Sequence, residues 1–234
     1  MHTYDKNYFK IALPAALEGL FMILLASTDL IMVGALGALS IAAVSIFMQP
    51  RLILLCFSRS LASSVTLLVS QKAGAGDTNG TSDIMKKSLT LCAIFMGLLH
   101  ILFYIFLDDI FYLMGANDEY MAEAMAYGPI ALAAVYVTSL TLILQAVQLG
   151  YGRTSVIMKT NVCGNVVNLA LNALLIFGFG PIPSLGVTGA AIGTLVSTIF
   201  TLAWTTWILK NESFFSGGSY LPDRAYFHRM MPIL

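Results

Sequence analysis

The sequence predicts an all-α fold, a polytopic membrane protein built as a six-transmembrane-helix bundle followed by the start of a seventh helix. Composition is the first reason, since 58% of the 234 residues are hydrophobic and only 10% are charged, whereas soluble domains are about one quarter charged. The second reason is that apolar stretches of about 20 residues recur along the chain, each long enough to cross a bilayer as a helix. Because lipid offers backbone groups no hydrogen-bond partners, these stretches are expected to be helices and not open strands.

The six predicted spans are separated by short connectors. The first twelve residues are too polar for a signal peptide, and the apolar stretch behind them is too long for its hydrophobic region, so we expect the first span to be retained. The second and third spans flank a connector that carries lysines, the third and fourth flank an acidic one, and the last two flank one without basic residues. The predicted spans are 11–33, 41–70, 88–107, 124–149, 156–178 and 186–209.

The basic residues alternate between connectors, which sets the orientation. Ten of the twelve Lys and Arg residues lie in the N-terminal segment, in connectors 71–87 and 150–159, and in the tail after the sixth span. The intervening connectors contain none, and the one between the third and fourth spans is acidic. By the positive-inside rule, the N-terminus and the chain from residue 210 onward are therefore predicted to be cytoplasmic.

The end of the chain repeats a pattern from its beginning. YFKIALP (Tyr8–Pro14) and YFHRMMP (Tyr226–Pro232) each follow an acidic residue, and the six predicted spans fill the interval between them. Transporters are often built from such repeats, with the substrate path between the halves. Since a helix that starts near residue 227 and stops at 234 is too short to cross a membrane, we expect a longer protein. The predicted parts are a six-helix lobe (1–210), a cytoplasmic inter-lobe linker (211–226) and the start of helix seven of a second lobe (227–234).

Two predicted spans carry polar residues on one face. Glu18 and Asp29 in the first span are eleven residues apart, which places them about 20° from each other around a helix. The fifth span holds four asparagines within an arc of about 60°. Ionisable residues inside a membrane tend to mark ion or substrate pathways, and amide oxygens suit hard cations. The four asparagines are therefore expected to face a hydrated cavity or an ion, and they are Asn161, Asn165, Asn168 and Asn172.

The second and fourth spans contribute further candidates. Arg51 and Arg59 lie about 80° apart on the second span. The favoured interpretation is an ion pair with Asp29 or Glu18, because buried charges need partners; the alternative is attraction of an anionic substrate. The fourth span carries a looser polar stripe. More than half of stripes of this kind are explained by packing and local hydrogen bonds, so it carries less weight. The stripe consists of Thr138, Thr141, Gln145 and Gln148.

Several chemistries find no support in the sequence. The glycine-rich stretch at Gly74 and Gly76 is not followed by Gly-Lys-Ser/Thr, so it is no phosphate-binding loop. Zinc-protease, nucleophile-elbow and haem-attachment patterns do not occur, and the charge pattern does not resemble that of a nucleic-acid binder. The sequence therefore predicts neither an enzyme nor a cofactor. Transport must then couple to an ion gradient, run downhill or depend on a partner.

Four stretches together resemble the multidrug and toxic compound extrusion (MATE) family, part of the multidrug, oligosaccharidyl-lipid and polysaccharide transporter superfamily. They are TDLIMVGALGALSIAAV (Thr28–Val44), SQKAGAGD (Ser70–Asp77), NLALNALLIFGFGP (Asn168–Pro181) and LGVTGAAIGTLVS (Leu185–Ser197). The resemblance implies a twelve-helix, two-lobed antiporter of the bacterial inner (plasma) membrane. It would exchange protons or sodium for organic, often cationic, compounds by alternating access. Its partners would be the organic substrate, the lipid bilayer and the second lobe, which belongs to the same longer chain or to a dimer partner.

The resemblance also implies a coupling site. The family's first-helix D-x-x-M-V-G pattern places its aspartate at Asp29, and the sixth-helix G-A-A-x-x-T pattern places its threonine at Thr194. The fifth-helix pattern N-x-x-x-D reads Asn168-x-x-x-Asn172 here, so an amide replaces the second carboxylate. That replacement is expected to weaken sodium binding while Asp29 still exchanges a proton. The implied coupling residues are Asp29, Asn168, Asn172 and Thr194, and the expected cavity or substrate residues are Glu18, Asn161, Asn165, Gln145, Thr141, Arg51 and Arg59.

Two other functions stay open at this point. A flippase for a lipid-linked precursor is slightly favoured by Arg51 and Arg59, which could face a pyrophosphate head group. A half-length membrane subunit that transports nothing itself, and only supports a partner, is the third hypothesis.

Overall fold

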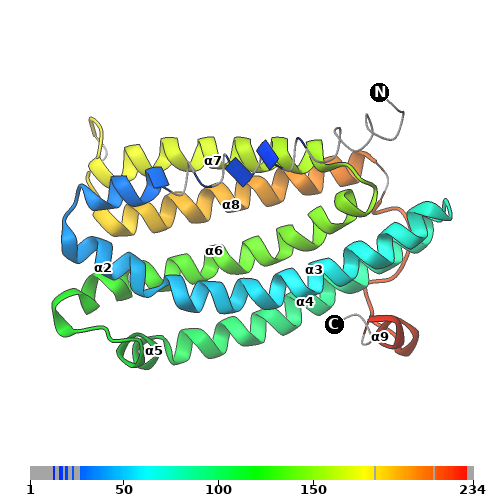
Figure 1. Cartoon of the computed structure of the whole chain (residues 1–234), viewed down its shortest axis with the longest axis horizontal. Coiled ribbons are helices and arrows are strands. Elements are labelled where there is room, and N and C mark those ends of the chain that lie inside the picture. The colour runs from blue at the N-terminus through cyan, green and yellow to red at the C-terminus, as the bar shows by residue number, and fades with distance from the viewer. Residues whose placement is uncertain are drawn as a thin grey trace.

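The protein is described from a computed structural model, which places residues 13, 16, 17, 19, 20, 23, 27–181, 183–212 and 214–230. This part of the chain is helical and confirms the predicted all-α class. Residues 27–34 form a helix at the end of the first predicted span, and most of the rest of that span lies outside the described residues. The labelled helices (Figure 1) are α2 (Ala38–Ile46), α3 (Met48–Gly74), α4 (Thr78–Ile105), α5 (Leu107–Leu113), α6 (Asp118–Gly150), α7 (Thr154–Phe177), α8 (Gly186–Asn211) and α9 (Arg224–Met230).

Five stretches of the described chain are long and apolar enough to cross a membrane: α2 with α3, then α4, α6, α7 and α8. They confirm the second to sixth predicted spans, but most extend beyond the predicted ends. The reason is geometric, since the 33 residues of α6 rise about 50 Å at 1.5 Å per residue. The hydrocarbon core is about 30 Å thick, so α6 continues into the polar connectors.

The second predicted span is made of two helices rather than one. The chain bends at Phe47, between the last residue of α2 and the first of α3. Pro50 explains the break, because its ring clashes with the carbonyl of Ile46 four residues earlier and its nitrogen has no hydrogen to donate. The ring of Phe47 is only 2% exposed and packs edge-on against Tyr127 of α6, with ring centroids 5.9 Å apart. This contact fixes the bend against the longest helix.

Helix α6 lies at the centre of the bundle. Figure 1 shows α7 and α8 on one side of it and α3 and α4 on the other. A buried hydrogen bond of 2.7 Å joins Ser58 of α3 to Ser139 of α6, and each hydroxyl group also donates to a backbone carbonyl of its own helix. These two buried hydroxyl groups are therefore satisfied between and within helices, as a lipid environment requires.

Helices α7 and α8 approach each other closely at Gly189. A Cβ atom at this position would lie 2.5 Å from the carbonyl oxygen of Leu175 in α7, so only glycine fits against that backbone. Gly193, one turn further along, faces the side chain of Asn172 in the same way. The Gly-x-x-x-Gly pair thus serves close helix packing, as its spacing in the sequence predicts.

Charges are separated between the two ends of the bundle. The connectors after α3 and α6 lie at the same end as α9, and the opposite end carries α5 and the connector between α7 and α8 (Figure 1). The first end therefore gathers Lys72, Lys87 and Arg153, while the second carries Asp108 and Asp109 of α5. This alternation agrees with the predicted topology, and the assignment of the first end to the cytoplasm stays a prediction.

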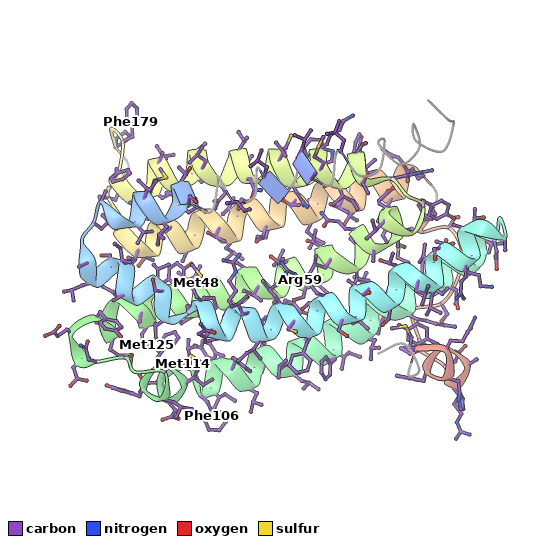
Figure 2. The ribbon with its side chains drawn as sticks, viewed as in Figure 1. Met48, Arg59, Phe106, Met114, Met125 and Phe179 are labelled. Atoms are coloured by element: carbon purple, nitrogen blue, oxygen red, sulfur yellow. The ribbon has the colours of Figure 1, made fainter. Side chains whose placement is uncertain are left out.

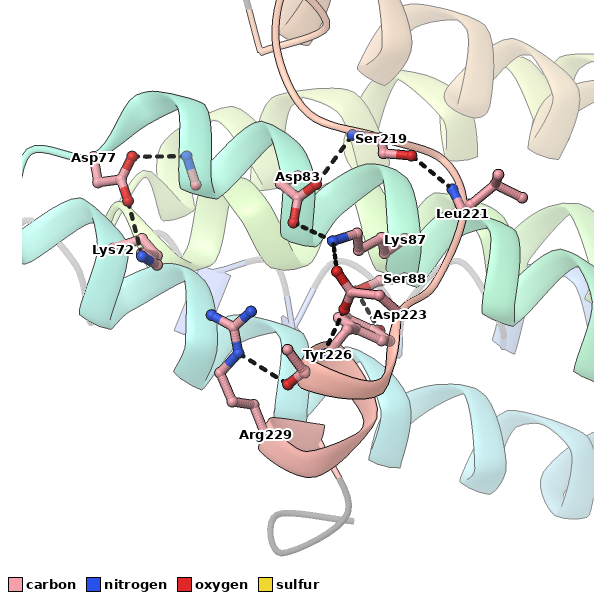
Figure 3. A network of polar contacts seen from close by, with 12 residues as sticks. Lys72, Asp77, Asp83, Lys87, Ser88, Ser219, Leu221, Asp223, Tyr226 and Arg229 are labelled. Carbon is pink, nitrogen blue, oxygen red and sulfur yellow. Dashed lines mark hydrogen bonds and ion pairs between the residues drawn. The ribbon is translucent and has the colours of Figure 1, made fainter.

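The segment after α8, residues 214–230, is tied to the beginning of α4, and we call it the strap. Its backbone passes so close that a Cβ atom on Gly218 would meet the backbone of Asp83. The carboxylate of Asp83 accepts a hydrogen bond of 3.0 Å from the Ser219 N–H. Figure 3 shows this network, in which the buried ammonium group of Lys87 bridges Asp83 at 2.6 Å and Asp223 at 2.8 Å.

The second part of the strap is helix α9, which buries one aromatic residue. Asp223 accepts a hydrogen bond of 2.7 Å from the Tyr226 N–H and so caps the helix. The Tyr226 ring is 1% exposed, and its hydroxyl lies 2.8 Å from that of Ser88 in α4. α9 begins at Arg224, three residues before the predicted start of helix seven, and residues 231–234 lie outside the described chain. A seventh membrane span stays a prediction.

We expect Gly189→Ala to destabilise the bundle by about 1–3 kcal/mol, the usual cost of overpacking, because the new methyl group meets the backbone of α7. Thermal unfolding in detergent measures the effect. Gly74→Ala is the control, since no atom beyond its chain neighbours and its own helix backbone lies within 4 Å of the corresponding Cβ position at the end of α3. Equal melting temperatures for the two variants would contradict the packing argument.

Attachment of the strap is expected to depend on ionised Asp223. The hydrogen bond from Lys87, joined by the one from the Tyr226 N–H, lowers the pKa of Asp223 below its ordinary value of 3.8. A carboxyl group with a lowered pKa contributes stability above its unfolded pKa and loses it as the pH falls through the folded pKa. The strap should therefore stay attached at neutral pH and detach only below about pH 3.8.

A nitroxide on Leu221→Cys, a position 77% exposed, reports this attachment by its mobility in electron paramagnetic resonance. Mobility should rise on acidification and should already be high at pH 7 with Asp223→Asn. The matched control is Asp109→Asn at the opposite end of the bundle. A label that stays equally immobile in Asp223→Asn would show that the ion pair does not hold the strap.

Candidate functional site

A cavity of about 300 Å³ lies within the bundle. Its wall is formed by the first helix and by α2, α3, α6, α7 and α8. Every predicted site residue that the structure describes lines it, whereas Glu18 lies outside the described residues. These lining residues are Asp29, Arg51, Arg59, Thr141, Gln145, Asn161, Asn165, Asn168, Asn172 and Thr194.

The asparagine stripe faces this cavity because of how α7 packs. The face of α7 that carries Gly164 packs against α8, and the glycine leaves room for the side chain of Thr201 in α8. Asn168 and Asn172 are buried, at 8% and 2% exposure. Neighbouring Val166 is 56% exposed and points away from the stripe, since successive residues of a helix are about 100° apart. The predicted polar stripe is thus one wall of the cavity.

The carboxylate of Asp29 is held by amide groups of α7. The Asn172 side chain donates to Oδ1 of Asp29 at 3.0 Å. Turned with its nitrogen toward Asp29, the amide of Asn168 donates to both carboxylate oxygens at 3.0 and 3.2 Å and accepts from the Thr194 N–H at 3.2 Å. Turned the other way, it donates to the Thr194 hydroxyl oxygen at 3.3 Å. Both orientations join the four predicted coupling residues in one cluster.

The cluster offers oxygen atoms and a single carboxylate. The Thr194 hydroxyl donates to the Ala190 carbonyl at 2.9 Å and keeps its oxygen available as an acceptor. Oδ1 of Asn172 is buried without a hydrogen-bond partner in the described structure. The described residues contain no group of three or more His, Cys, Asp and Glu that could hold a metal ion. The chemistry of the cluster therefore suits a proton or a weakly held hard cation.

The other polar residues of the wall divide into two kinds. Gln145 of α6 donates to Asn161 of α7 at 2.7 Å, so this pair joins two helices across the cavity. The Thr141 hydroxyl donates to the carbonyl of Val137 in its own helix at 3.0 Å. Gln148 belongs to the predicted stripe of α6 but leaves the cavity, because it donates to Glu212 after α8 at 3.0 Å.

The predicted ion pair between the two arginines and Asp29 is wrong for the described structure, whereas the alternative pairing with Glu18 lies outside the described residues and stays a prediction. Neither Arg51 nor Arg59 forms an ion pair with Asp29, whose oxygens accept from amides instead. Both arginine side chains are exposed to the cavity that they line. Figure 2 shows Arg59 about halfway along the bundle. The cavity thus presents two guanidinium groups to whatever it contains.

Sequence reasoning missed part of the wall. Tyr127 of α6 lines the cavity together with Phe47 and Met48 of the bend, and no polar pattern in the sequence points to them. A second missed set lies on α8, where residues three, four and seven positions after Thr194 share its helical face. That spacing was a usable signal, and these residues are Ser197, Thr198 and Thr201.

Comparison with known proteins identifies relatives along most of the chain. The family model MatE matches residues 14–174. The probable multidrug resistance protein NorM of Rhizobium meliloti is 28% identical, and the match takes in 80% of this chain and 40% of that protein. The probable multidrug resistance protein YoeA of Bacillus subtilis is 29% identical over 71% of this chain and 36% of its own. A FAD transporter of Shewanella oneidensis is 28% identical, with 77% and 40% covered.

Solved structures show the same arrangement of helices. An outward-facing multidrug resistance MATE family transporter superposes with a TM-score of 0.86 at 24% identity, covering 97% of this chain and 50% of that one. A Vibrio cholerae MATE transporter gives 0.88 at 22% identity, with 97% and 52% covered. These likenesses show the fold. The chain spans less than half the length of the curated relatives above and about half that of the two structures.

We expect the cavity to be hydrated and the outer face of α7 to be in lipid. In a variant whose native cysteines Cys56, Cys92 and Cys163 are replaced by alanine, Asn165→Cys should react quickly with a charged methanethiosulfonate, and Val166→Cys should react slowly. The reason is that the reactive thiolate forms in water and not in hydrocarbon. Mass spectrometry of labelled membranes measures both rates. Similar rates at the two adjacent positions would contradict the assignment.

Proposed function

Because the chain belongs to the MatE family, we propose that it forms one lobe of a secondary active transporter that exports small organic molecules. The relatives that carry the name multidrug resistance protein support this, and so does a cavity lined by both polar and aromatic side chains. Because the chain spans less than half of these relatives, a second six-helix lobe completes the substrate path. That lobe belongs to a continuation of the chain or to a partner copy. The protein lies in the bacterial plasma membrane, with the strap on the cytoplasmic side.

The observation that carries the proposal is the contact between Asp29 and the α7 amides. An ionised Asp29 accepts hydrogen bonds from Asn172 and, in one amide orientation, from Asn168. Protonation turns one carboxylate oxygen into a hydroxyl group, which is a donor and a weaker acceptor for the amide nitrogen. Oδ1 of Asn172 has no partner among the described residues, and rotation of the amide would let it accept from this hydroxyl group. Uptake of a proton thus changes the hydrogen bonds between the first helix and α7, and export follows as the lobes rock.

The coupling ion is proposed to be a proton in preference to sodium. The cluster holds one carboxylate, with the amide of Asn172 where a second would stand in the resembled pattern. One negative charge attracts a sodium ion less than two do, whereas a single carboxyl group is sufficient to carry a proton. Sodium coupling stays the alternative.

Transport of a lipid-linked precursor is a second candidate function. Arg51 and Arg59 favour it, because both line the cavity and neither pairs with a described carboxylate. A guanidinium group can bind a phosphate through two parallel hydrogen bonds. A lipid head group that carries a phosphate would therefore find two suitable partners in the cavity.

The first test is Asp29→Asn in the natural full-length protein reconstituted into vesicles. We expect transport driven by an imposed proton gradient to fall to the level of empty vesicles, for ethidium (a cation) and carboxyfluorescein (an anion) alike. The matched control is Asp109→Asn, whose side chain is exposed at the far end of the bundle, and it should transport normally. Unchanged transport by Asp29→Asn, with equal insertion into the vesicles, would overturn the coupling role.

The same assay separates the two ions. Asn172→Asp places a second carboxylate beside Asp29, and this variant should gain transport driven by a sodium gradient. Wild-type protein that already responds to sodium, and not to protons, would overturn the preference for a proton.

A further inference from the structure

The described charged residues of the cavity wall have an excess of positive charge. Among the described residues that line it, Asp29 is the acidic one and Arg51 and Arg59 are the basic ones. Their formal charges sum to +1. A charge within the membrane region is costly unless it has a partner or water. The wall is therefore suited to a negatively charged occupant.

None of the described acidic residues forms an ion pair with Arg51 or Arg59. Asp29 accepts hydrogen bonds from amides, and the ion pairs of the described chain lie at the end of the bundle that carries the strap. They join Lys72 to Asp77, Lys87 to Asp83 and Asp223, and Arg153 to Glu212. Neither guanidinium group of the cavity wall belongs to these pairs. Within the described part of the chain neither has a carboxylate partner, so both can bind a molecule in the cavity.

The shape of the wall complements this charge. Arg51 and Arg59 are eight residues apart on α3, so their backbones are separated by about 12 Å along the helix. Between and around them the wall is apolar, with Phe47, Leu55 and Tyr127. A molecule with an aromatic or aliphatic body can rest on these residues while its anionic group reaches a guanidinium. The spacing also provides two successive positions for that group along the path.

We propose that the substrates of this cavity include organic anions, and that Arg51 and Arg59 bind the phosphate group of such a molecule. This inference rests on the proposed transport function, because it names a further charge class that the cavity carries. A planar guanidinium group matches a phosphate with two hydrogen bonds. The phosphate has two potential sources, a soluble phosphorylated molecule or the head group of a lipid, and the experiment distinguishes them.

Flavin mononucleotide and riboflavin are the probes, because they share one ring system and differ by a phosphate. Binding to the natural full-length protein is measured by flavin fluorescence in nanodiscs of phosphatidylcholine. We expect flavin mononucleotide to bind about tenfold more tightly, as a charge-assisted hydrogen bond of about 1.5 kcal/mol implies. Equal affinities in the wild-type protein would overturn the proposal.

Variants assign the preference to the two arginines. Arg51→Gln and Arg59→Gln should each reduce the preference, and the double variant should abolish it without weakening riboflavin binding. Arg51→Lys keeps the charge and should retain part of the preference. Arg224→Gln, exposed on α9, is the matched control and should change nothing. A double variant that still prefers flavin mononucleotide would show that the arginines do not bind the phosphate.

Nanodiscs with added phosphatidic acid separate the two sources of phosphate. Competition by the lipid at the wild-type site, absent in the double variant, would assign the site to a lipid phosphate; no competition would assign it to soluble anions. Failure of this inference differs from failure of the proposed function. Vesicles that export ethidium but bind the two flavins equally would refute only the anion site, whereas flavin preference without gradient-driven transport would refute only the transport function.

Discussion

A carboxylate within a membrane bundle needs hydrogen bonds, and the structure of this lobe depends on how Asp29 obtains them. Its donors are side-chain amides of α7. Asn172 can occupy its position only because residue 193 of α8 is glycine, since a Cβ atom there would collide with the Asn172 amide. One turn earlier, Gly189 sets the same close approach against the α7 backbone. The hydrogen bonds to Asp29 therefore depend on the position of the α7 amides, and that position depends on the close packing of α8.

Basic residues at the strap end of the lobe form ion pairs, whereas those in its interior have no described carboxylate partner. At the end with the strap, Lys87 and Arg153 each have a carboxylate within 2.8 Å. In the interior, the guanidinium groups of Arg51 and Arg59 face a cavity without such a described partner. Ion pairs at the end hold helices and strap together, whereas charges left available inside the bundle can bind a substrate.

Sequence periodicity was sufficient for some of these features and insufficient for others. The asparagine stripe and Asp29 could be placed because a helix of fixed pitch turns residues at known angles toward one side. The break at Phe47 was missed, although it has a local cause, because Pro50 cannot donate to the carbonyl of the residue four positions earlier. Gln148 could not be placed, since its partner Glu212 is 64 residues away. The sequence also could not show whether Asp29 contacts an arginine or an amide, because that depends on how helices distant in sequence pack together.

The bridge at Lys87 also has a consequence for biosynthesis. Asp83 is four residues before Lys87, whereas Asp223 follows it by 136 residues. At about 5–20 residues per second, the ribosome needs roughly 7 to 27 s to add that stretch. During this time the ammonium group of Lys87 in the newly inserted α4 is already paired with Asp83, one helical turn away. Asp83 thus neutralises Lys87 until Asp223 has been synthesised and can bind as the second partner.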